Sequence, residues 1–274
     1  MTTNTDAPVA HVIGDPITHS KSPLIHRFWL EALEMIGDYD AVHVTPADLG
    51  EYIARQRDMP EWRGCNVTLP HKLAILDHVA DKGGLRDDLG AANTVFRDEN
   101  GDLAATNTDI AGFYSPLAGF PFEESHVVVI GAGGAARAAL YALGKAGTAR
   151  VTVMNRSPLK AMGLIAKFGL KGDVVPLGSP LPPADLLVNA SSLGMRGQPA
   201  LDIDLSPLPD DATVYDIVYA PLETALLAQA RERDLDTIDG LEMLIGQAAL
   251  AFELFFGAEP PRDRDDELRA ALTA

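Results

Sequence analysis

The densest group of side chains able to do chemistry lies in the segment Asn66-Val67-Thr68-Leu69-Pro70-His71-Lys72. The sequence predicts a helix over residues 70–80, with Lys72 in its first turn. The positive end of the helix macrodipole disfavours a cation there and favours the neutral amine that proton transfer requires. Lys72 is therefore a candidate acid/base group, and an ordinary solvated lysine is the alternative.

Three other polar segments precede or follow predicted helices or strands. Thr106-Asn107-Thr108-Asp109 lies at a strand-to-helix junction, where Thr108 or Asp109 could simply cap the helix. Ser20 and Ser22 lie in a loop before a helix, with Ser22 expected at the N-cap, and the same loop could present both hydroxyls to a small anion. Asn93 and Thr94 follow a turn, for which turn chemistry is a sufficient explanation.

A glycine-rich turn near the middle of the chain points to a nucleotide. The stretch 127–137 reads as an apolar strand, a tight turn and an alanine-rich helix. Gly131 permits the turn, Gly133 removes a side chain that would hold a pyrophosphate away, and Ala136 lets the helix lie close to the strand. The exposed N–H groups at the helix start would face the anion. We predict dinucleotide contacts from Gly131, Ala132, Gly133, Gly134 and Ala135. A tightly packed turn without a ligand is the alternative.

The end of the next predicted strand, 151–154, indicates which dinucleotide is bound. An NAD-binding domain usually carries an acid there to hold the ribose 2′-hydroxyl, but this chain has Asn155, Arg156 and Ser157, with Lys160 one helical turn later. A guanidinium and a hydroxyl can donate to a 2′-phosphate. The segment therefore predicts NADP rather than NAD, unless Arg156 is only a solvated surface residue.

Composition excludes several classes of function. The chain has 274 residues, enough for two modest domains, and a net charge of −17, which argues against binding to nucleic acid or to an anionic membrane. The only cysteine, Cys65, is compatible with a reducing compartment, and neither a secretory leader nor a long apolar run is evident, so we expect a cytoplasmic protein. His19, His26 and His71 lack metal-ligand spacing, and we expect no metal.

Strands and helices alternate through both halves of the chain. The sequence therefore predicts an α/β protein of two domains, the second a doubly wound parallel sheet of the Rossmann type. Predicted strands cover residues 10–14, 39–44, 64–68, 92–97, 103–106, 127–130, 151–154, 185–189 and 213–218, with a further short strand ending at 238.

Taken together, these motifs resemble the shikimate dehydrogenase family. The matching segments, in unbroken order over about residues 10–257, are Ser20-Lys21-Ser22-Pro23, Asn66 to Lys72, Ala92-Asn93-Thr94, Asn107-Thr108-Asp109, Gly131 to Arg137, Asn155-Arg156-Ser157, Asn189-Ala190-Ser191-Ser192, Asp216 to Pro221 and Asp239 to Gln247. The resemblance implies NADPH-dependent reduction of 3-dehydroshikimate to shikimate, on the route to the aromatic amino acids.

The resemblance also implies residue roles. Lys72 would be the proton acid/base and Asp109 its acidic partner. Substrate contacts would come from Ser20, Ser22, Asn66, Thr68, Asn93, Asp109, Tyr219 and Gln247, and Gly240 and Met243 would flank the nicotinamide. Residues 1–108 and 244–274 would form a discontinuous substrate domain and residues 109–243 the NADP domain, with the active-site cleft between them. We expect a monomer or a homodimer.

Two departures from the family pattern and two alternatives remain. Ile110 and Glu242 stand where the family often has glycine or a small residue, which affects the expected fit of substrate and nicotinamide. A quinate/shikimate dehydrogenase that uses NAD or both cofactors is one alternative, against which Arg156 and Ser157 argue. A non-catalytic ligand sensor on the same fold is the other, and the presence of both Lys72 and Asp109 weighs against it.

Overall fold

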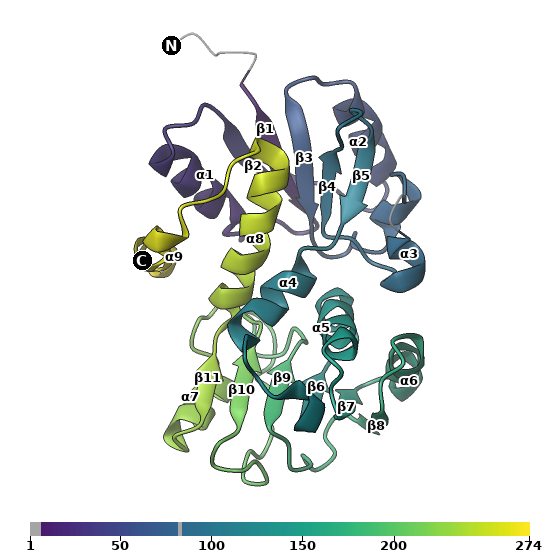
Figure 1. Ribbon diagram of the computed structural model, residues 1–274, viewed down its shortest axis with the longest axis vertical. Helices are drawn as coiled ribbons and strands as arrows, with labels where there is room; N and C mark the ends of the chain where they lie inside the picture. Colours follow the sequence, from purple (N-terminus) through teal and green to yellow (C-terminus); the bar gives the residue numbers. More distant parts are fainter. Residues whose placement is uncertain (1–6, 82–83) are drawn as a thin grey trace. The chain divides into compact units, whose positions relative to one another are not determined.

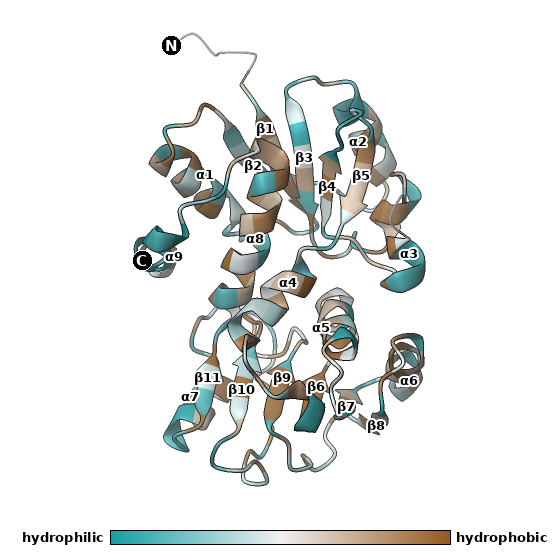
Figure 2. Cartoon of the chain, in the orientation of Figure 1, coloured by the Kyte–Doolittle hydropathy of each residue, from teal (hydrophilic) through white to brown (hydrophobic). Residues whose placement is uncertain are grey.

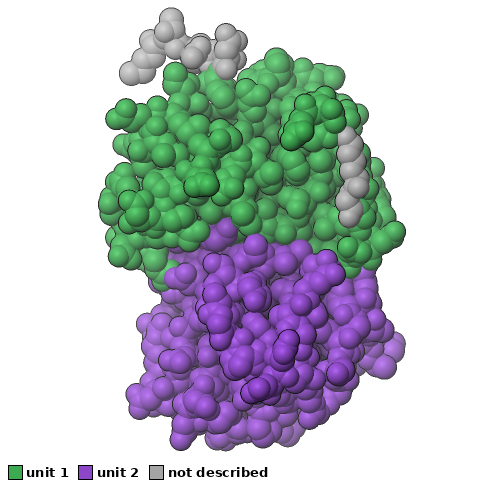
Figure 3. Space-filling view, viewed as in Figure 1, with its two compact units in different colours: residues 1–108, 247–274 green, residues 109–246 purple. Residues whose placement is uncertain are grey.

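The computed structural model of the protein describes residues 7–81 and 84–274, which form two compact units (Figures 1 and 3). Unit 1 comprises Met1–Thr108 and Gln247–Ala274, and unit 2 comprises Asp109–Gly246. The second division falls inside one long helix, α8 (Gly240–Phe256), at residue 247 rather than at residue 244 as the sequence suggested. Residues 1–6 of the expected first domain lie outside the described residues.

Unit 1 is built on a mixed five-stranded sheet in the order β2-β1-β3-β4-β5. Its strands are β1 (Val9–Gly14), β2 (Asp38–His43), β3 (Trp62–Val67), β4 (Thr94–Arg97) and β5 (Leu103–Thr106). The first three in chain order are parallel, and β4 and β5 join as an antiparallel hairpin. The helices are α1 (Ser22–Ala32), α2 (Leu49–Arg57), α3 (Leu85–Asp88) and α9 (Asp265–Thr273), with 3-10 turns at Ala74–Asp77 and Arg262–Arg264.

The alternation of side chains along β1 explains why both faces of this sheet are covered. Ile13 packs with residues of α2 and of the Ala74–Asp77 turn, whereas its neighbour Val12 packs with Ala251 and Phe255 of α8. Successive strand residues point to opposite faces, so a strand with apolar residues at consecutive positions must be buried on both sides.

Unit 2 is a six-stranded sheet of parallel strands in the order β11-β10-β9-β6-β7-β8. Its strands are β6 (His126–Ile130), β7 (Arg150–Asn155), β8 (Gly172–Pro176), β9 (Leu186–Asn189), β10 (Thr213–Asp216) and β11 (Asp236–Ile238). Its other helices are α4 (Asp109–Tyr114), α5 (Gly134–Lys145), α6 (Pro158–Lys167) and α7 (Ala225–Glu232), with 3-10 turns at Ser115–Leu117 and Phe122–Glu124.

The first strand of unit 2 lies at the centre of its sheet. The chain adds β7 and β8 on one side of β6, then returns to add β9, β10 and β11 on the other. Val127 and Val129 pack against α5, whereas Val128 and Ile130 pack with residues of α7, so β6 is buried on both faces. The brown colour of β6 in Figure 2 marks its residues as mostly hydrophobic. This is the doubly wound Rossmann order, and it confirms the predicted fold class.

Two local predictions were wrong. No α-helix covers residues 70–80, which form turns and the 3-10 turn Ala74–Asp77. Lys72 therefore does not lie in the first turn of an α-helix and experiences no helix macrodipole there. Ser22 is the first residue of α1 and not its N-cap, which is Lys21, and no side chain caps that helix.

Within residues 7–81 and 84–274, no helix combines the length and the apolar character needed to cross a membrane.

Candidate active site

Buried polar side chains gather in unit 1 where β3 ends and β4 begins. Asn66 near the end of β3 pairs with Thr94 at the start of the antiparallel strand β4. Five polar residues of this cluster are at most 7% exposed, namely Asn66, Asn93, Thr94, Thr108 and Gln247. Buried polar groups require hydrogen-bond partners, and these residues supply partners for one another.

Asn93 is at the centre of this polar cluster. Its Oδ1 accepts the backbone N–H of Thr108 at 2.7 Å, and its Nδ2 donates to Thr108 Oγ1 at 2.9 Å and lies 3.4 Å from Gln247 Oε1. The Nδ2 of Asn66 donates to Thr94 Oγ1 at 3.0 Å. The structure thus brings together Asn66, Asn93 and Gln247, which are distant in sequence and were assigned to one substrate.

The backbone around Lys72 is held at three points. The His71 Nε2 donates to the carbonyl of Val44 at 2.7 Å, and the Thr68 N–H donates to the carbonyl of Ile13 at 3.0 Å. The carbonyl of Lys72 itself accepts the N–H of Ala92 at 2.7 Å. His71 is almost fully buried, whereas Lys72 is half-buried. These contacts, and not a helix, fix where the lysine stands.

The loop that carries Ser20 and Ser22, here called the serine loop, leaves the unit 1 sheet at the end where β3 passes into the Lys72 segment. β1 and β3 are parallel neighbours with Ile13 opposite Val67, so the loop after Gly14 and the segment after Val67 leave the sheet side by side. In that loop the backbone N–H of Ser22 lies 3.3 Å from Ser20 Oγ. Ser22 is buried and Ser20 is half-buried. Loops at the carboxyl ends of parallel strands are the usual ligand sites of α/β sheets.

In unit 2, the glycine turn lies at the point where the strand order reverses, between β6 and β9. Gly131 has a φ of +112°, and a Cβ there would lie 2.8 Å from the carbonyl oxygen of Ala190 after β9, so both the turn and the close approach require glycine. A Cβ on Gly133, in contrast, would meet nothing within 4 Å. The start of α5 therefore faces open space, as a pyrophosphate site requires.

The segment after β7 lies beside this turn. Ile130 of β6 pairs with Met154 of β7, and the Gly131 N–H donates to the Met154 carbonyl at 2.9 Å. The next residues are held by a turn in which Asn155 Nδ2 donates to the Ser157 carbonyl at 2.9 Å. Arg156, Ser157 and Lys160 are exposed. They can therefore offer donors to an anion beside the glycine turn.

The ends of β9 and β10 are joined by a buried acid, Asp216, which begins one of the segments that resemble the family but to which the sequence assigned no role. Asp216 is fully buried, and its carboxylate accepts from Asn189 Nδ2 at 2.9 Å, from the Val218 N–H at 3.0 Å and from Thr224 Oγ1 at 2.7 Å. Burial raises the pKa of Asp216, and the bonds from Thr224, Val218 and Asn189 oppose that rise. The sequence feature that could have identified Asp216 is its place as an acid at the end of an apolar strand.

The comparisons with known proteins agree with one another along the chain. The shikimate dehydrogenase substrate-binding domain matches residues 12–95, shikimate / quinate 5-dehydrogenase matches residues 117–192, and the shikimate 5′-dehydrogenase C-terminal domain matches residues 240–265. The chain is also 65% identical over 268 residues to the NADP(+) shikimate dehydrogenase of Sphingopyxis alaskensis, covering 98% of each. The chain belongs to the shikimate dehydrogenase family.

Solved members of the shikimate dehydrogenase family share the fold. The shikimate 5-dehydrogenase of Thermus thermophilus, in complex with NADP(H) and shikimate, matches with a TM-score of 0.85 at 37% identity over 97% of this chain and 99% of that one. Quinate dehydrogenase of Corynebacterium glutamicum in complex with NAD matches with the same TM-score at 30% identity, covering 97% and 99%. The fold alone therefore does not decide between the two substrates.

The remaining predicted residues of this shikimate dehydrogenase family member lie in unit 2. Asp109 is buried at the start of α4, and Tyr219 is half-buried in the loop after β10. Gly240 begins α8, where a Cβ would lie 2.5 Å from the carbonyl oxygens of Ile217 and Val218. Met243 packs into the core. Gly240 thus has a packing reason to be glycine besides the expected nicotinamide contact.

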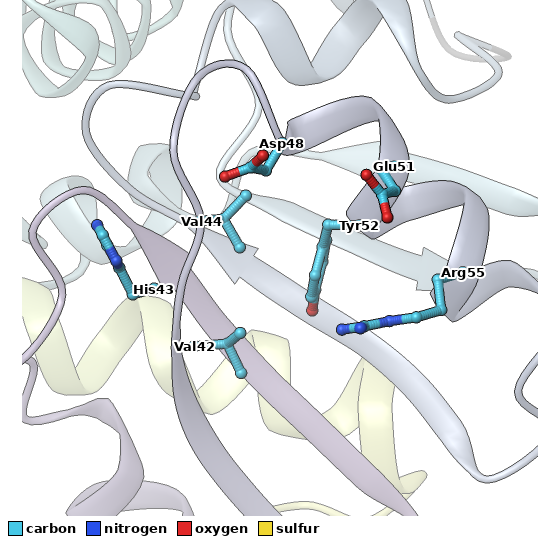
Figure 4. A pocket seen from close by; sticks show the side chains of 7 residues that line it. All are labelled: Val42, His43, Val44, Asp48, Glu51, Tyr52 and Arg55. Atoms are coloured by element: carbon cyan, nitrogen blue, oxygen red, sulfur yellow. The ribbon is translucent and has the colours of Figure 1, made fainter.

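A cavity of about 220 Å³ in unit 1 lies elsewhere than the predicted site. It is lined by Val42, His43, Val44, Asp48, Glu51, Tyr52 and Arg55, with Tyr52 and Arg55 coming from α2 (Figure 4). None of the residues assigned to substrate or cofactor is among them. Among the described residues, no group of three or more His, Cys, Asp or Glu side chains is arranged to hold a metal.

Proposed function

We propose that the chain catalyses the reversible reduction of 3-dehydroshikimate to shikimate with NADPH as the hydride donor. The observation that carries this proposal is the 65% identity, over 98% of both chains, to an NADP(+) shikimate dehydrogenase. The match extends over both units, and so over the segments that carry the polar cluster of unit 1 and the glycine turn of unit 2.

The cofactor of this enzyme is NADP. Its pyrophosphate fits the N–H groups from Gly131 to Ala135, since the space beside Gly133 is open. Its 2′-phosphate fits Arg156, Ser157 and Lys160, which are exposed beside that turn. When bound, NADPH supplies the hydride.

The residues that we assign to the substrate include Asp109 and Tyr219 besides those of the serine loop and the polar cluster. Ser20 and Ser22 donate hydrogen bonds to the substrate carboxylate. Asn66, Thr68, Asn93 and Gln247 read the ring hydroxyls, for which amides and hydroxyls that both donate and accept are suited. The strongest support is the buried network around Asn93, because it holds these amides in one orientation.

Lys72 exchanges the proton. As the substrate's C3 carbonyl gains a hydride at carbon, its oxygen gains negative charge and must take up a proton, which the ammonium of Lys72 can give; in the reverse direction the neutral amine takes the proton back. Asp109 orients the lysine and accepts from a substrate hydroxyl. Such a division of roles needs Lys72 at a fixed point, which the bonds of His71 and of the Lys72 carbonyl provide.

We place the enzyme in the cytoplasm, where its single buried cysteine would stay reduced, and expect it to work as a monomer or a homodimer. The charge of −17 disfavours nucleic acid and anionic membranes as partners.

Replacement of Lys72 tests the proton role. Lys72→Met keeps most of the aliphatic chain and removes the amine, so kcat for shikimate oxidation should fall roughly 100- to 10,000-fold while NADPH binding stays unchanged. Stopped-flow turnover and NADPH fluorescence titration measure the two quantities. Lys171→Met, at an exposed lysine of unit 2 before β8, is the matched control and should keep wild-type turnover. Wild-type turnover in Lys72→Met would remove Lys72 from the mechanism.

A further inference from the structure

A buried tyrosine lies at one end of the polar cluster in unit 1. Tyr39 of β2 is 0% exposed, and its hydroxyl donates to Asn66 Oδ1 at 2.6 Å. β2 and β3 are not neighbours, because β1 lies between them. Tyr39 pairs with Ala10 of β1, and Asn66 pairs with Val12. The small side chain of Ala10 leaves room for the tyrosine ring to lie across β1 toward Asn66.

The backbone N–H of Thr108 fixes which groups donate and which accept in the hydrogen bonds between Asn93, Thr94 and Asn66. The backbone N–H of Thr108 can only donate, so Asn93 Oδ1 is an acceptor. The Thr94 hydroxyl donates to that oxygen at 2.9 Å, so its lone pairs face its two other neighbours, Asn66 and, at 3.4 Å, Thr108 Oγ1. Asn66 therefore presents Nδ2 to Thr94 at 3.0 Å and to the Asn93 carbonyl at 3.4 Å, and Oδ1 to Tyr39. The donor to Asn66 Oδ1 is therefore the Tyr39 hydroxyl.

The tyrosine ring is itself held in place. It stacks on His26 of α1 at 3.9 Å between centroids and 3° between planes, and the ring of Phe255 of α8 lies 6.3 Å from it between centroids. Burial raises the pKa of Tyr39 well above its usual value, while a hydrogen bond with the Ser22 side chain opposes the rise. The hydroxyl therefore keeps its proton at every working pH and remains a donor. It also links Ser22, assigned to the carboxylate, with Asn66, assigned to a ring hydroxyl.

We propose that Tyr39 is a positioning residue for substrate recognition, whose hydroxyl helps to hold the amide of Asn66 in the orientation that reads a ring hydroxyl. A carbonyl oxygen has two lone pairs, so Asn66 Oδ1 keeps one for a donor on the substrate. Without the tyrosine hydroxyl, the two orientations of the Asn66 amide become closer in energy, and part of the protein presents a donor where the substrate needs an acceptor. This inference rests on the proposed role of Asn66.

Tyr39→Phe removes only the hydroxyl and tests the proposal. One neutral hydrogen bond corresponds to a rise of about 3- to 10-fold in the KM for shikimate, with kcat and the KM for NADP within about twofold of wild type. Tyr52→Phe is the matched control, because Tyr52 is also a buried tyrosine of unit 1 but its hydroxyl bonds to His11 Nδ1 at 2.7 Å, outside the polar cluster. Thermal melting of both variants shows whether either has lost its fold.

The same substitution in an Asn66→Ala background separates this inference from the proposed function. If Tyr39 acts through Asn66, Tyr39→Phe should change the shikimate KM less than about twofold once Asn66 is alanine. An unchanged effect in that background, or equal effects of Tyr39→Phe and Tyr52→Phe, would overturn the inference while leaving the role of Asn66 intact. A wild-type shikimate KM in Asn66→Ala alone would overturn the assignment of Asn66, and the inference with it.

Discussion

Arg156 decides the choice of cofactor in this account. It stands at the end of β7, where an NAD-binding domain would carry an acid, and Ser157 and Lys160 are exposed beside it. A guanidinium binds a phosphate through charge-assisted hydrogen bonds that a ribose hydroxyl cannot replace. The specificity for NADP over NAD should therefore depend on this one side chain far more than on the glycine turn, which contacts the part common to both.

Arg156→Ala should raise the KM for NADP by roughly 10- to 100-fold and leave the KM for NAD nearly unchanged, because only NADP loses charged hydrogen bonds. Initial rates with each cofactor at saturating shikimate measure both values. Arg150→Ala removes an arginine from the opposite end of the same strand, where it pairs with Asp173, and serves as the control. Equal losses with NADP and NAD would contradict a 2′-phosphate role for Arg156.

At the scale of elements, the loops after β9 and β10 depend on Asp216. Its carboxylate receives three donors, one of them from Thr224, whose hydroxyl also accepts the Leu227 N–H at the start of α7. Removing a buried acceptor leaves its donors without a partner and costs more than the bonds are worth. The loop that carries Tyr219 is thus held by the strand that precedes it.

Asp216→Ala should lower the free energy of unfolding by roughly 3 kcal/mol or more, because three buried donors lose their acceptor at about 1 to 3 kcal/mol each. Asp216→Asn should cost less, because an amide oxygen can still accept from Asn189 and Val218. Urea unfolding followed by circular dichroism measures both, and Asp204→Ala, at an exposed acid of the same unit, should leave the midpoint nearly unchanged. A wild-type midpoint for Asp216→Ala would show that these bonds do not hold the loops.

The sequence predicted those elements whose own residues determine their structure. The valines before Gly131 favour a strand and the alanines after it favour a helix. The parallel sheet was predicted because strands and helices alternate along the chain. β8 was missed, because its sequence begins with glycine, ends with proline and has few apolar residues. The helix expected at 70–80 was wrong because the tertiary bonds of His71 and the Lys72 carbonyl hold that segment in turns.

In the candidate site, sequence motifs indicated which residues to consider but not which hydrogen bonds hold their side chains in place. Asn66, Asn93 and Gln247 came from a family resemblance, and their contacts with one another could not be read from their spacing because the fold brings them together. Thr94 and Thr108 looked like ordinary turn and cap residues, yet each bonds to Asn93. Asp216 gave a weak signal, since one acid in a strand predicts burial only when the sheet is known.

For the whole molecule, a buried histidine couples folding to pH. His26 is fully buried among aromatic rings, including Trp29 and Phe252, and burial lowers its pKa to about 3. In the unfolded chain its pKa is near 6.5. Between these values the unfolded state binds a proton that the folded state does not, so stability falls as the pH falls from about 6.5 to 3, by at most about 1.4 kcal/mol per pH unit from this group.

His26→Phe should reduce that slope by about one proton between about pH 6 and pH 4, because the substituted ring cannot titrate. His26→Leu should reduce the slope equally while lowering stability at every pH through poorer packing against Tyr39. Urea unfolding at several pH values measures the slope and the offset separately. If the slope stays at its wild-type value in both variants, His26 is not the group that titrates.

The central claim, an NADP-dependent enzyme for shikimate, is tested most directly by absorbance of the reduced nicotinamide with purified protein in four mixtures, shikimate or quinate with NADP or NAD. We expect fast turnover with shikimate and NADP and little in the other three mixtures, with the preference for NADP reduced in Arg156→Ala. Equal rates with quinate or with NAD would move the protein to the quinate/shikimate branch of the family. No turnover in any mixture would contradict the account and favour a ligand sensor.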